Sequence, residues 1–132
     1  VAPVRAAIEL IRDAVRAGTV RTVTDISDGG ITTALGELVI NSGLGCEADL
    51  EPVIVRHECS AEDALFGEAP GGFIIAGEKS QIELLAGQGV EVDLLGEVGG
   101  EMLNVTAREM RVEVLAAEAS AAFESLAHKI EA

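Results

Sequence analysis

The sequence has no tryptophan or tyrosine and only three phenylalanines, so few aromatic side chains are available for a core or a binding surface. Stacking of bases on aromatic platforms is therefore disfavoured. Basic residues are also scarce, since 9 lysines and arginines stand against 23 acidic residues and give a net charge of −14. Such a surface repels phosphate backbones and anionic lipid, so we expect neither a nucleic-acid partner nor a membrane partner.

Metal, disulfide and membrane signals are missing as well. Cys46 and Cys59 match no zinc or redox spacing, and His57 and His128 stand alone, so we predict free buried thiols and no metal site. No apolar run approaches the roughly 20 residues of a membrane span, and we expect no signal peptide before the fold. These features favour a cytoplasmic protein. A chain that begins at Val1 is expected to be a processed piece, a cloned fragment or a sequence lacking its start.

What is present is enough for one folded domain. The chain has 132 residues, of which 48% are hydrophobic, and no low-complexity linker divides it. We therefore predict a single domain over residues 1–132, with a core of small aliphatic side chains. Periodicity and apolar runs assign to that core Ile8, Ile11, Val23, Ile26, Leu35, Leu38, Phe73, Ile74, Ile75 and Leu94.

Helical and strand patterns alternate along the chain. Helical spacing predicts helices over residues 4–16, 31–40, 61–65, 80–86 and 116–130. Runs rich in branched apolar residues predict strands over 20–26, 44–50, 73–76, 90–98, 102–106 and 111–115. Residues 51–59 read as irregular, and Gly99-Gly100 predicts a hairpin turn. The fold class is therefore α+β, or α/β layered, with a mixed sheet covered by helices.

One turn has the composition of an anion site. The strand predicted over 20–26 contains Asp25 near its end, Ser27 and Asp28 follow, and Gly29-Gly30 precedes an apolar helix. Glycines at a helix N-terminus leave backbone N–H groups free for a phosphate, and the helix dipole attracts the anion. The two carboxylates oppose such binding. The alternative is that Ser27 or Asp28 only caps the helix and the glycines only make the turn.

A second glycine-rich stretch contains Glu68, between a short predicted helix and a buried strand. Its carboxylate could hold an amide or hydroxyl group of a ligand. The alternative is a surface or capping carboxylate in a tight connection. No nucleophile, base and orienting group can be assembled from the rest of the chain, so we assign no catalytic residue.

Together these stretches resemble a known family. Residues 24–50, TDISDGGITTALGELVINSGLGCEADL, are followed by LFGEAPGGFII at 65–75 and VEVDLLGEV at 90–98. In this order and spacing they resemble the C-terminal domain shared by the aminoimidazole-ribotide synthetase superfamily. Within it the chain is most similar to the phosphoribosylformylglycinamidine synthases, and there to the second C-terminal domain.

The resemblance implies the fold of that C-terminal domain and a place in de novo purine synthesis. The synthase uses ATP and magnesium to convert formylglycinamide ribotide and glutamine-derived ammonia into the amidine, forming a carbon–nitrogen bond. In the synthase, the C-terminal domain has two kinds of partner. They are an N-terminal ATP-binding domain of the same protein and a glutaminase subunit or domain. The chemistry lies on the N-terminal domains. This chain alone is thus expected to bind no cofactor, to be inactive and to scaffold a composite site.

The chain also departs from the family pattern. Where the working half of the synthase usually has Glu-Ser-Gln, this sequence has Glu68, Ala69 and Pro70, and Gly72 replaces a frequent arginine. Two of the three polar groups of the family pattern are therefore missing, which argues against direct contact with substrate. Two alternatives stay open. One is a domain of a paralogue, such as thiamine-monophosphate kinase, selenophosphate synthetase or a hydrogenase-maturation protein. The other is a free-standing, non-catalytic binding module.

Overall fold

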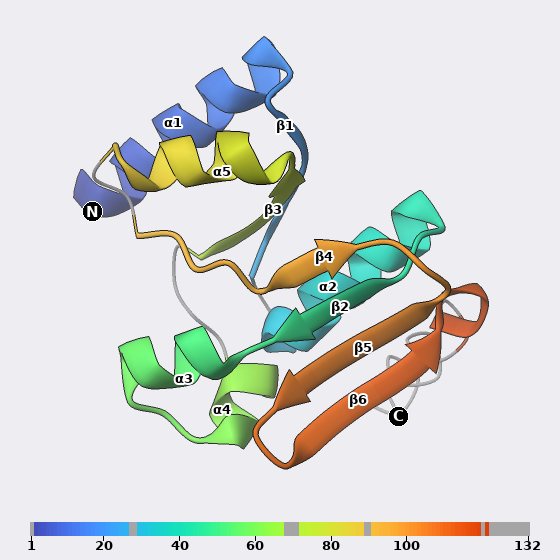
Figure 1. The fold of residues 1–132 in the computed structure, drawn as a ribbon. Coiled ribbons are helices and arrows are strands. Elements are labelled where there is room, and N and C mark those ends of the chain that lie inside the picture. Colours follow the sequence, from blue (N-terminus) through green and yellow to red (C-terminus); the bar gives the residue numbers. More distant parts are fainter. Residues whose placement is uncertain (1, 27–28, 68–71, 89–90, 120, 122–132) are drawn as a thin grey trace, which may run out of the picture.

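The chain folds into helices packed on two separate β-sheets in a computed structural model that describes residues 2–26, 29–67, 72–88, 91–119 and 121 (Figure 1). The helices are α1 (Ala2–Ala17), α2 (Gly30–Ser42), α3 (Glu51–His57), α4 (Ala61–Phe66) and α5 (Lys79–Ala86). The strands are β1 (Val20–Asp25), β2 (Cys46–Asp49), β3 (Phe73–Gly77), β4 (Gly96–Val98), β5 (Met102–Ala107) and β6 (Met110–Leu115). The predicted mixed α/β class is confirmed, although the strands divide between two sheets.

The larger sheet has the strand order β4-β2-β5-β6. Strand β2 runs parallel to β5, with Cys46 opposite Leu103, and antiparallel to β4. Strands β5 and β6 form a hairpin whose connection contains Arg108, at a left-handed φ of 58°. Helices α2 and α4 both contact β5, so they cover this sheet on its apolar side (Figure 1).

The hairpin predicted at Gly99-Gly100 is wrong. Strand β2 lies between β4 and β5, and the Gly45 backbone is hydrogen-bonded to Gly99 and Gly100 at 2.8 and 2.9 Å. Glycines make this insertion possible, because a Cβ at Gly45 would overlap the Met102 backbone and one at Gly96 would overlap the Glu47 carbonyl. Local turn chemistry indicated a reversal, but the close approach of β2 fills the space between the two strands.

The smaller sheet pairs β1 with β3 in antiparallel fashion, from Val20 opposite Gly77 to Asp25 opposite Phe73. Helix α1 contacts β1, and α5 contacts β3. A second apolar cluster lies here, built on Ala14, Val20 and Leu85. This part of the molecule joins the larger sheet through α2, which contacts both β1 and β5.

Two element predictions are corrected. Residues 51–57, expected to be irregular, form α3, because Pro52 fits a first helical turn and the Asp49 carboxylate accepts a hydrogen bond from the Glu51 N–H at 3.0 Å. The strand predicted over 90–98 is confined to Gly96–Val98 among the described residues. The Ser60 cap is confirmed, since its hydroxyl accepts from the Asp63 N–H at 3.1 Å. Most of the closing helix predicted at 116–130 lies outside the described residues.

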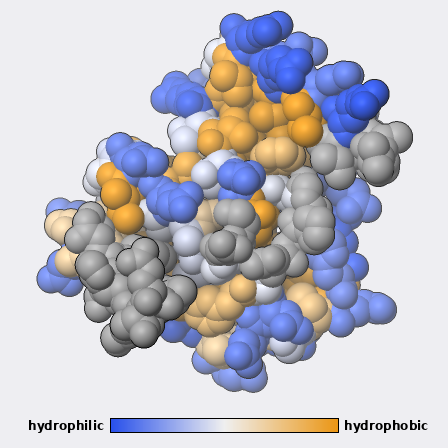
Figure 2. All heavy atoms as spheres, turned by 180° about the vertical axis from the view of Figure 1, so that it is seen from behind, coloured by the Kyte–Doolittle hydropathy of each residue, from blue (hydrophilic) through white to orange (hydrophobic). Residues whose placement is uncertain are grey.

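The main core lies between α2, α4 and the larger sheet, and Leu50, Leu65, Leu103 and Val105 in it are fully buried. Of the predicted core residues, Leu35 and Ile74 are buried, and Ile11, Val23, Ile26, Leu38, Phe73 and Ile75 are half-buried. The assignment of Ile8 and Leu94 to the core is wrong, because these residues are 38% and 46% exposed. In Figure 2 apolar side chains reach the surface among charged ones on the upper part of the molecule, which contains α1.

Both cysteines are free thiols, as predicted, but only Cys46 is buried, whereas Cys59 is half-buried. Burial raises the pKa of the Cys46 thiol, because a thiolate loses its hydration in the core. Within the part of the chain that the structure describes, no helix has the length and apolar character needed to cross a membrane.

The core predicts a contrast between two leucines. Leu103→Ala removes a side chain that is 0% exposed and should lower the free energy of unfolding by about 2–5 kcal/mol. Leu84→Ala, at a side chain 62% exposed on α5, should change it by less than about 0.5 kcal/mol. Urea denaturation followed by circular dichroism measures both. Equal losses from the two variants would contradict the assigned core.

Candidate functional site

The pairing of β1 with β3 brings the two predicted site segments to one place. Asp25, the last residue of β1, lies opposite Phe73, the first residue of β3. One residue further, the Ile26 N–H donates to the Gly72 carbonyl at 2.9 Å. The turn that follows β1 and the glycine-rich connection that precedes β3 therefore leave the same end of the small sheet. Of the predicted site residues, Asp25, Gly29 and Gly30 are described, and Ser27, Asp28 and Glu68 lie outside the described residues.

The two glycines of the turn have conformations that other residues rarely adopt. Gly29 has φ 86° and Gly30 has φ 72°. A Cβ at Gly29 would overlap the Thr33 hydroxyl, and one at Gly30 would lie 2.7 Å from the Gly67 carbonyl oxygen. Gly30 is therefore the point where the first turn of α2 touches the end of α4. The N-cap of α2 is Gly29, which supplies no side-chain cap, so capping by Ser27 or Asp28 stays a prediction.

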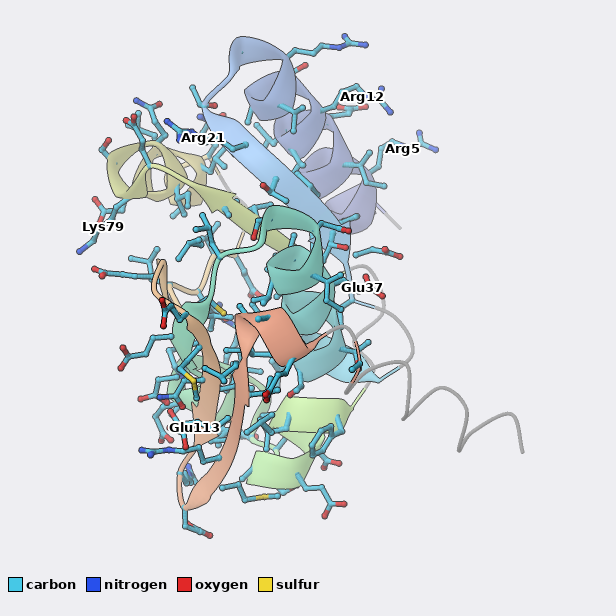
Figure 3. All side chains as sticks on the ribbon, turned by 90° about the vertical axis from the view of Figure 1, so that its right-hand side faces the viewer. Arg5, Arg12, Arg21, Glu37, Lys79 and Glu113 are labelled. Carbon is cyan, nitrogen blue, oxygen red and sulfur yellow. The ribbon has the colours of Figure 1, made fainter. Side chains whose placement is uncertain are left out.

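The electrostatic surroundings of the turn are acidic. The Asp25 side chain is exposed, and Glu37 of α2 accepts a hydrogen bond from the Thr24 hydroxyl at 3.5 Å. Arg21 of β1 is paired with Glu78 at 3.9 Å, and in Figure 3 Arg5 and Arg12 extend outward from α1, away from Glu37. An anion at Gly29 and Gly30 would thus depend on backbone N–H groups. Among the described residues no group of three acidic, histidine or cysteine side chains could hold a metal ion.

A hollow of about 920 Å³ opens beside this turn, between the small sheet, α2 and the edge of the larger sheet. Ile26, Ile31, Gly67 and Gly72 line it next to the two site segments, and Leu94 and Leu95 line it on the far side. Most of its lining is aliphatic. Gly29 and Gly30 are not among the residues that line it. It suits an apolar surface better than a charged metabolite.

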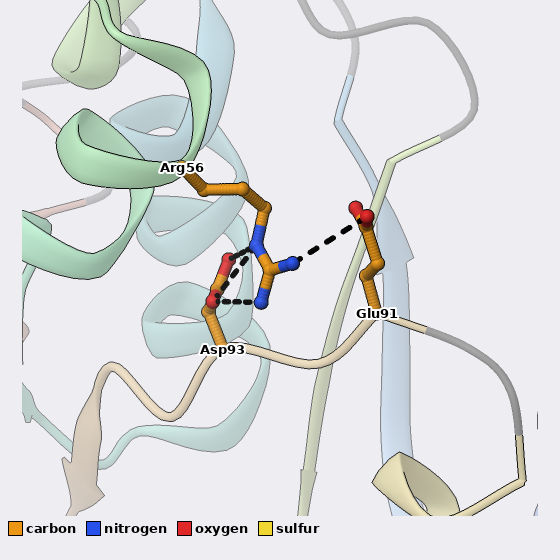
Figure 4. Close-up of polar contacts among 3 residues, drawn as sticks. All are labelled: Arg56, Glu91 and Asp93. Atoms are coloured by element: carbon orange, nitrogen blue, oxygen red, sulfur yellow. Dashed lines mark hydrogen bonds and ion pairs between the residues drawn. The ribbon is translucent and has the colours of Figure 1, made fainter.

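One polar cluster beside the hollow was not found from the sequence. Arg56 of α3 donates three hydrogen bonds to the Asp93 carboxylate at 2.7–3.1 Å and lies 3.5 Å from Glu91 (Figure 4). The hydrogen bonds and the charge of Asp93 raise the pKa of the Arg56 guanidinium. The pair joins residues 37 positions apart, so no local pattern indicated it. It fixes the segment before β4 against α3.

A buried hydroxyl lies in the first turn of α2. Thr32 is only 4% exposed, and its Oγ1 has no hydrogen-bond partner among the described residues. The neighbouring Thr33 places its hydroxyl against Gly29. The sequence analysis did not single out either threonine, since threonine in a helix has no distinctive spacing.

Most of the chain matches the sequence model of a known protein family. Residues 1–108 match the family model described as "AIR synthase related protein, C-terminal domain". The chain belongs to this family. The matched region contains both site segments and the strands that bring them together, and it ends in the turn before β6.

Curated relatives carry the name phosphoribosylformylglycinamidine synthase subunit PurL. The protein from Thermus thermophilus is 36% identical over 105 residues, covering 76% of this chain and 14% of the relative. That from Methanobrevibacter smithii is 32% identical over 97 residues, covering 73% of this chain and 14% of the relative. The chain thus spans about a seventh of these relatives and corresponds to one domain of them.

Solved structures show the same fold. The structure described as "T. maritima PurL complexed with FGAR" has a TM-score of 0.64 at 22% identity, covering 86% of this chain and 20% of that one. The structure described as "T. maritima PurL complexed with ATP" gives the same TM-score, with 21% of that chain covered. The resemblance inferred from the sequence motifs is confirmed at the level of family and fold.

The glycine turn predicts a contrast between two matched substitutions. Gly30 is the first residue of α2 and Gly43 directly follows the helix, and their φ angles are 72° and 73°. Only at Gly30 would an added Cβ meet another helix. Gly43→Ala should cost about 1–2 kcal/mol of stability from backbone strain alone. Gly30→Ala adds a clash with α4 and should cost about 2–5 kcal/mol. Thermal and urea unfolding compare the two, and equal costs would contradict the α2–α4 contact.

Proposed function

We propose that this chain is the second C-terminal domain of a phosphoribosylformylglycinamidine synthase. The full protein would make formylglycinamidine ribotide from formylglycinamide ribotide, glutamine-derived ammonia and ATP, in de novo purine synthesis. The family match over residues 1–108, together with the relatives from Methanobrevibacter smithii and Thermus thermophilus that carry this name, is the observation on which the proposal rests. A domain of a paralogue is less well supported, because the relatives named above are synthase subunits, and a free-standing module is less well supported, because those relatives continue far beyond this segment.

Within that protein the domain would form one wall of a composite site. The pairing of Asp25 with Phe73 supports this, because it directs both glycine-rich segments to one end of the small sheet. Backbone N–H groups of Gly29 and Gly30 would bind a phosphate group, and the Ser27 hydroxyl would add a donor. Asp25, Asp28 and Glu68 would bind hydroxyl or amino groups, or a cation that accompanies the phosphate.

Other parts of the enzyme would complete the site. The N-terminal ATP-binding domain would supply the residues that hold ATP and magnesium, since phosphoryl transfer needs positioned metal ions and a cationic clamp. The aliphatic hollow beside the turn would accept an apolar surface of that domain. A glutaminase subunit or domain would deliver ammonia. A solved structure described as "PurLQS from Thermotoga maritima" gives a precedent for an assembly that includes PurL. The cytoplasmic location remains a prediction.

Activity assays test the whole-protein proposal. The full-length gene product that contains this chain should form the amidine from formylglycinamide ribotide, ammonium and ATP, with release of phosphate. The 132-residue chain alone should show neither ATP turnover nor amidine formation. A full-length product that phosphorylates thiamine monophosphate or makes selenophosphate instead would replace the proposal with a paralogue. ATP turnover by the chain alone, abolished by Asp25→Asn, would make this domain an enzyme.

Amide NMR tests the anion site. Titration of the 132-residue chain with inorganic phosphate should shift the amide signals of Ser27, Gly29 and Gly30, weakly because Asp25 and Asp28 oppose the anion. Gly43, which has the same backbone conformation at the other end of α2, serves as the internal control and should not move. Shifts confined to another loop would remove the site from the glycine turn.

A further inference from the structure

Strand β6 ends the larger sheet and presents an unpaired edge among the described residues. Its six residues, Met110–Leu115, pair on one side with β5, and the strand order places no described strand on the other side. The strand contains neither lysine nor proline, and its two charged residues, Arg111 and Glu113, have opposite signs, so they can match a partner edge instead of repelling it. It lies beyond residues 1–108, the segment matched by the family model.

The backbone of β6 presents hydrogen-bonding groups to this edge at alternate residues. The Leu50 N–H donates to the Thr106 carbonyl, so that carbonyl of β5 points toward β2 and away from β6. The Ala116 N–H donates to the Glu101 carbonyl at 2.7 Å, so Ala116 faces β5. Since neighbouring residues of a strand point their backbone groups in opposite directions, those of Arg111, Glu113 and Leu115 face the open edge.

We propose that a second copy of this chain pairs with this edge, β6 against β6, in antiparallel orientation about a two-fold axis at Val112. Among two-fold antiparallel pairings that use the open backbone groups, those centred on Val112 or Glu113 overlap over five residues of the strand, whereas those centred on Arg111 or Val114 overlap over three. Centring on Arg111 sets two arginines opposite each other, and centring on Glu113 sets two glutamates opposite each other. Centring on Val112 sets Arg111 opposite the partner's Glu113 and Glu113 opposite the partner's Arg111.

The side chains on both faces of the strand fit this register. Arg111 and Glu113 share one face and form an ion pair of 3.7 Å within the chain, with side chains 58% and 47% exposed. In the dimer each charge would have an opposite charge beside it and across from it. On the other face, half-buried Val112 would meet its own counterpart, and Met110 would meet the partner's Val114. The two four-stranded sheets would join into one continuous sheet.

Charge reversal tests the register with the 132-residue chain. Arg111→Glu sets glutamate opposite glutamate twice, and Glu113→Arg sets arginine opposite arginine twice, so each variant should self-associate at least about tenfold more weakly. An equimolar mixture of the two variants restores both opposite-charge pairs and should dimerise again. The double variant Arg111→Glu/Glu113→Arg should dimerise like the unmodified chain. Sedimentation velocity at about 0.15 M salt measures all four, because screening limits the general repulsion between acidic chains.

A matched pair elsewhere controls for net charge. Arg21 and Glu78 form an exposed ion pair on the small sheet, and Arg21→Glu or Glu78→Arg changes the charge by the same amount. These variants should leave the dimer unchanged. Circular dichroism of every variant checks that the fold persists. A monomeric unmodified chain, a dimer indifferent to Arg111→Glu, or single variants that fail to recover when mixed would each overturn the proposal.

Discussion

The close approach of α2 to α4 at Gly30 is the constraint on which the candidate site depends. The helix begins where a Cβ would strike the Gly67 carbonyl, so only glycine lets the two helices meet there. That contact places the start of α2 beside Phe66 and Gly67, the last described residues before the segment that leads to β3. The pairing of β1 with β3 then closes the same region from the other side. One missing side chain thus allows two remote segments to share one end of a sheet.

Most elements of the fold could be predicted from the sequence because their signals are local. Helix α2 shows apolar spacing and ends at Gly43, and α4 has its Ser60 cap. The errors arose where a non-local contact decided the outcome. The turn at Gly99-Gly100 is real, yet β2 occupies the position that a hairpin partner would take. Ile8 has the right period for a core residue, but periodicity does not tell how far a neighbouring layer extends.

The sequence allowed the residues of the candidate site to be predicted, but not their arrangement in space. Glycine pairs and carboxylates in a strand–turn–helix pattern identified the segment around Gly29, and the family resemblance linked it to Glu68. That both segments leave one end of the small sheet follows from strand pairing across about fifty residues, which composition does not encode. The Arg56–Asp93 pair and the buried Thr32 hydroxyl carry no sequence motif at all.

The position of β2 between β4 and β5 also constrains the order in which the chain can fold during synthesis. Cys46 pairs with Val98 and Leu103, so neither neighbouring strand has been synthesised when β2 emerges from the ribosome. About fifty more residues must follow before β2 can pair on either edge. Its two neighbours then arrive almost together. The larger sheet should therefore assemble in one late, slow step, dominated by contacts distant in sequence.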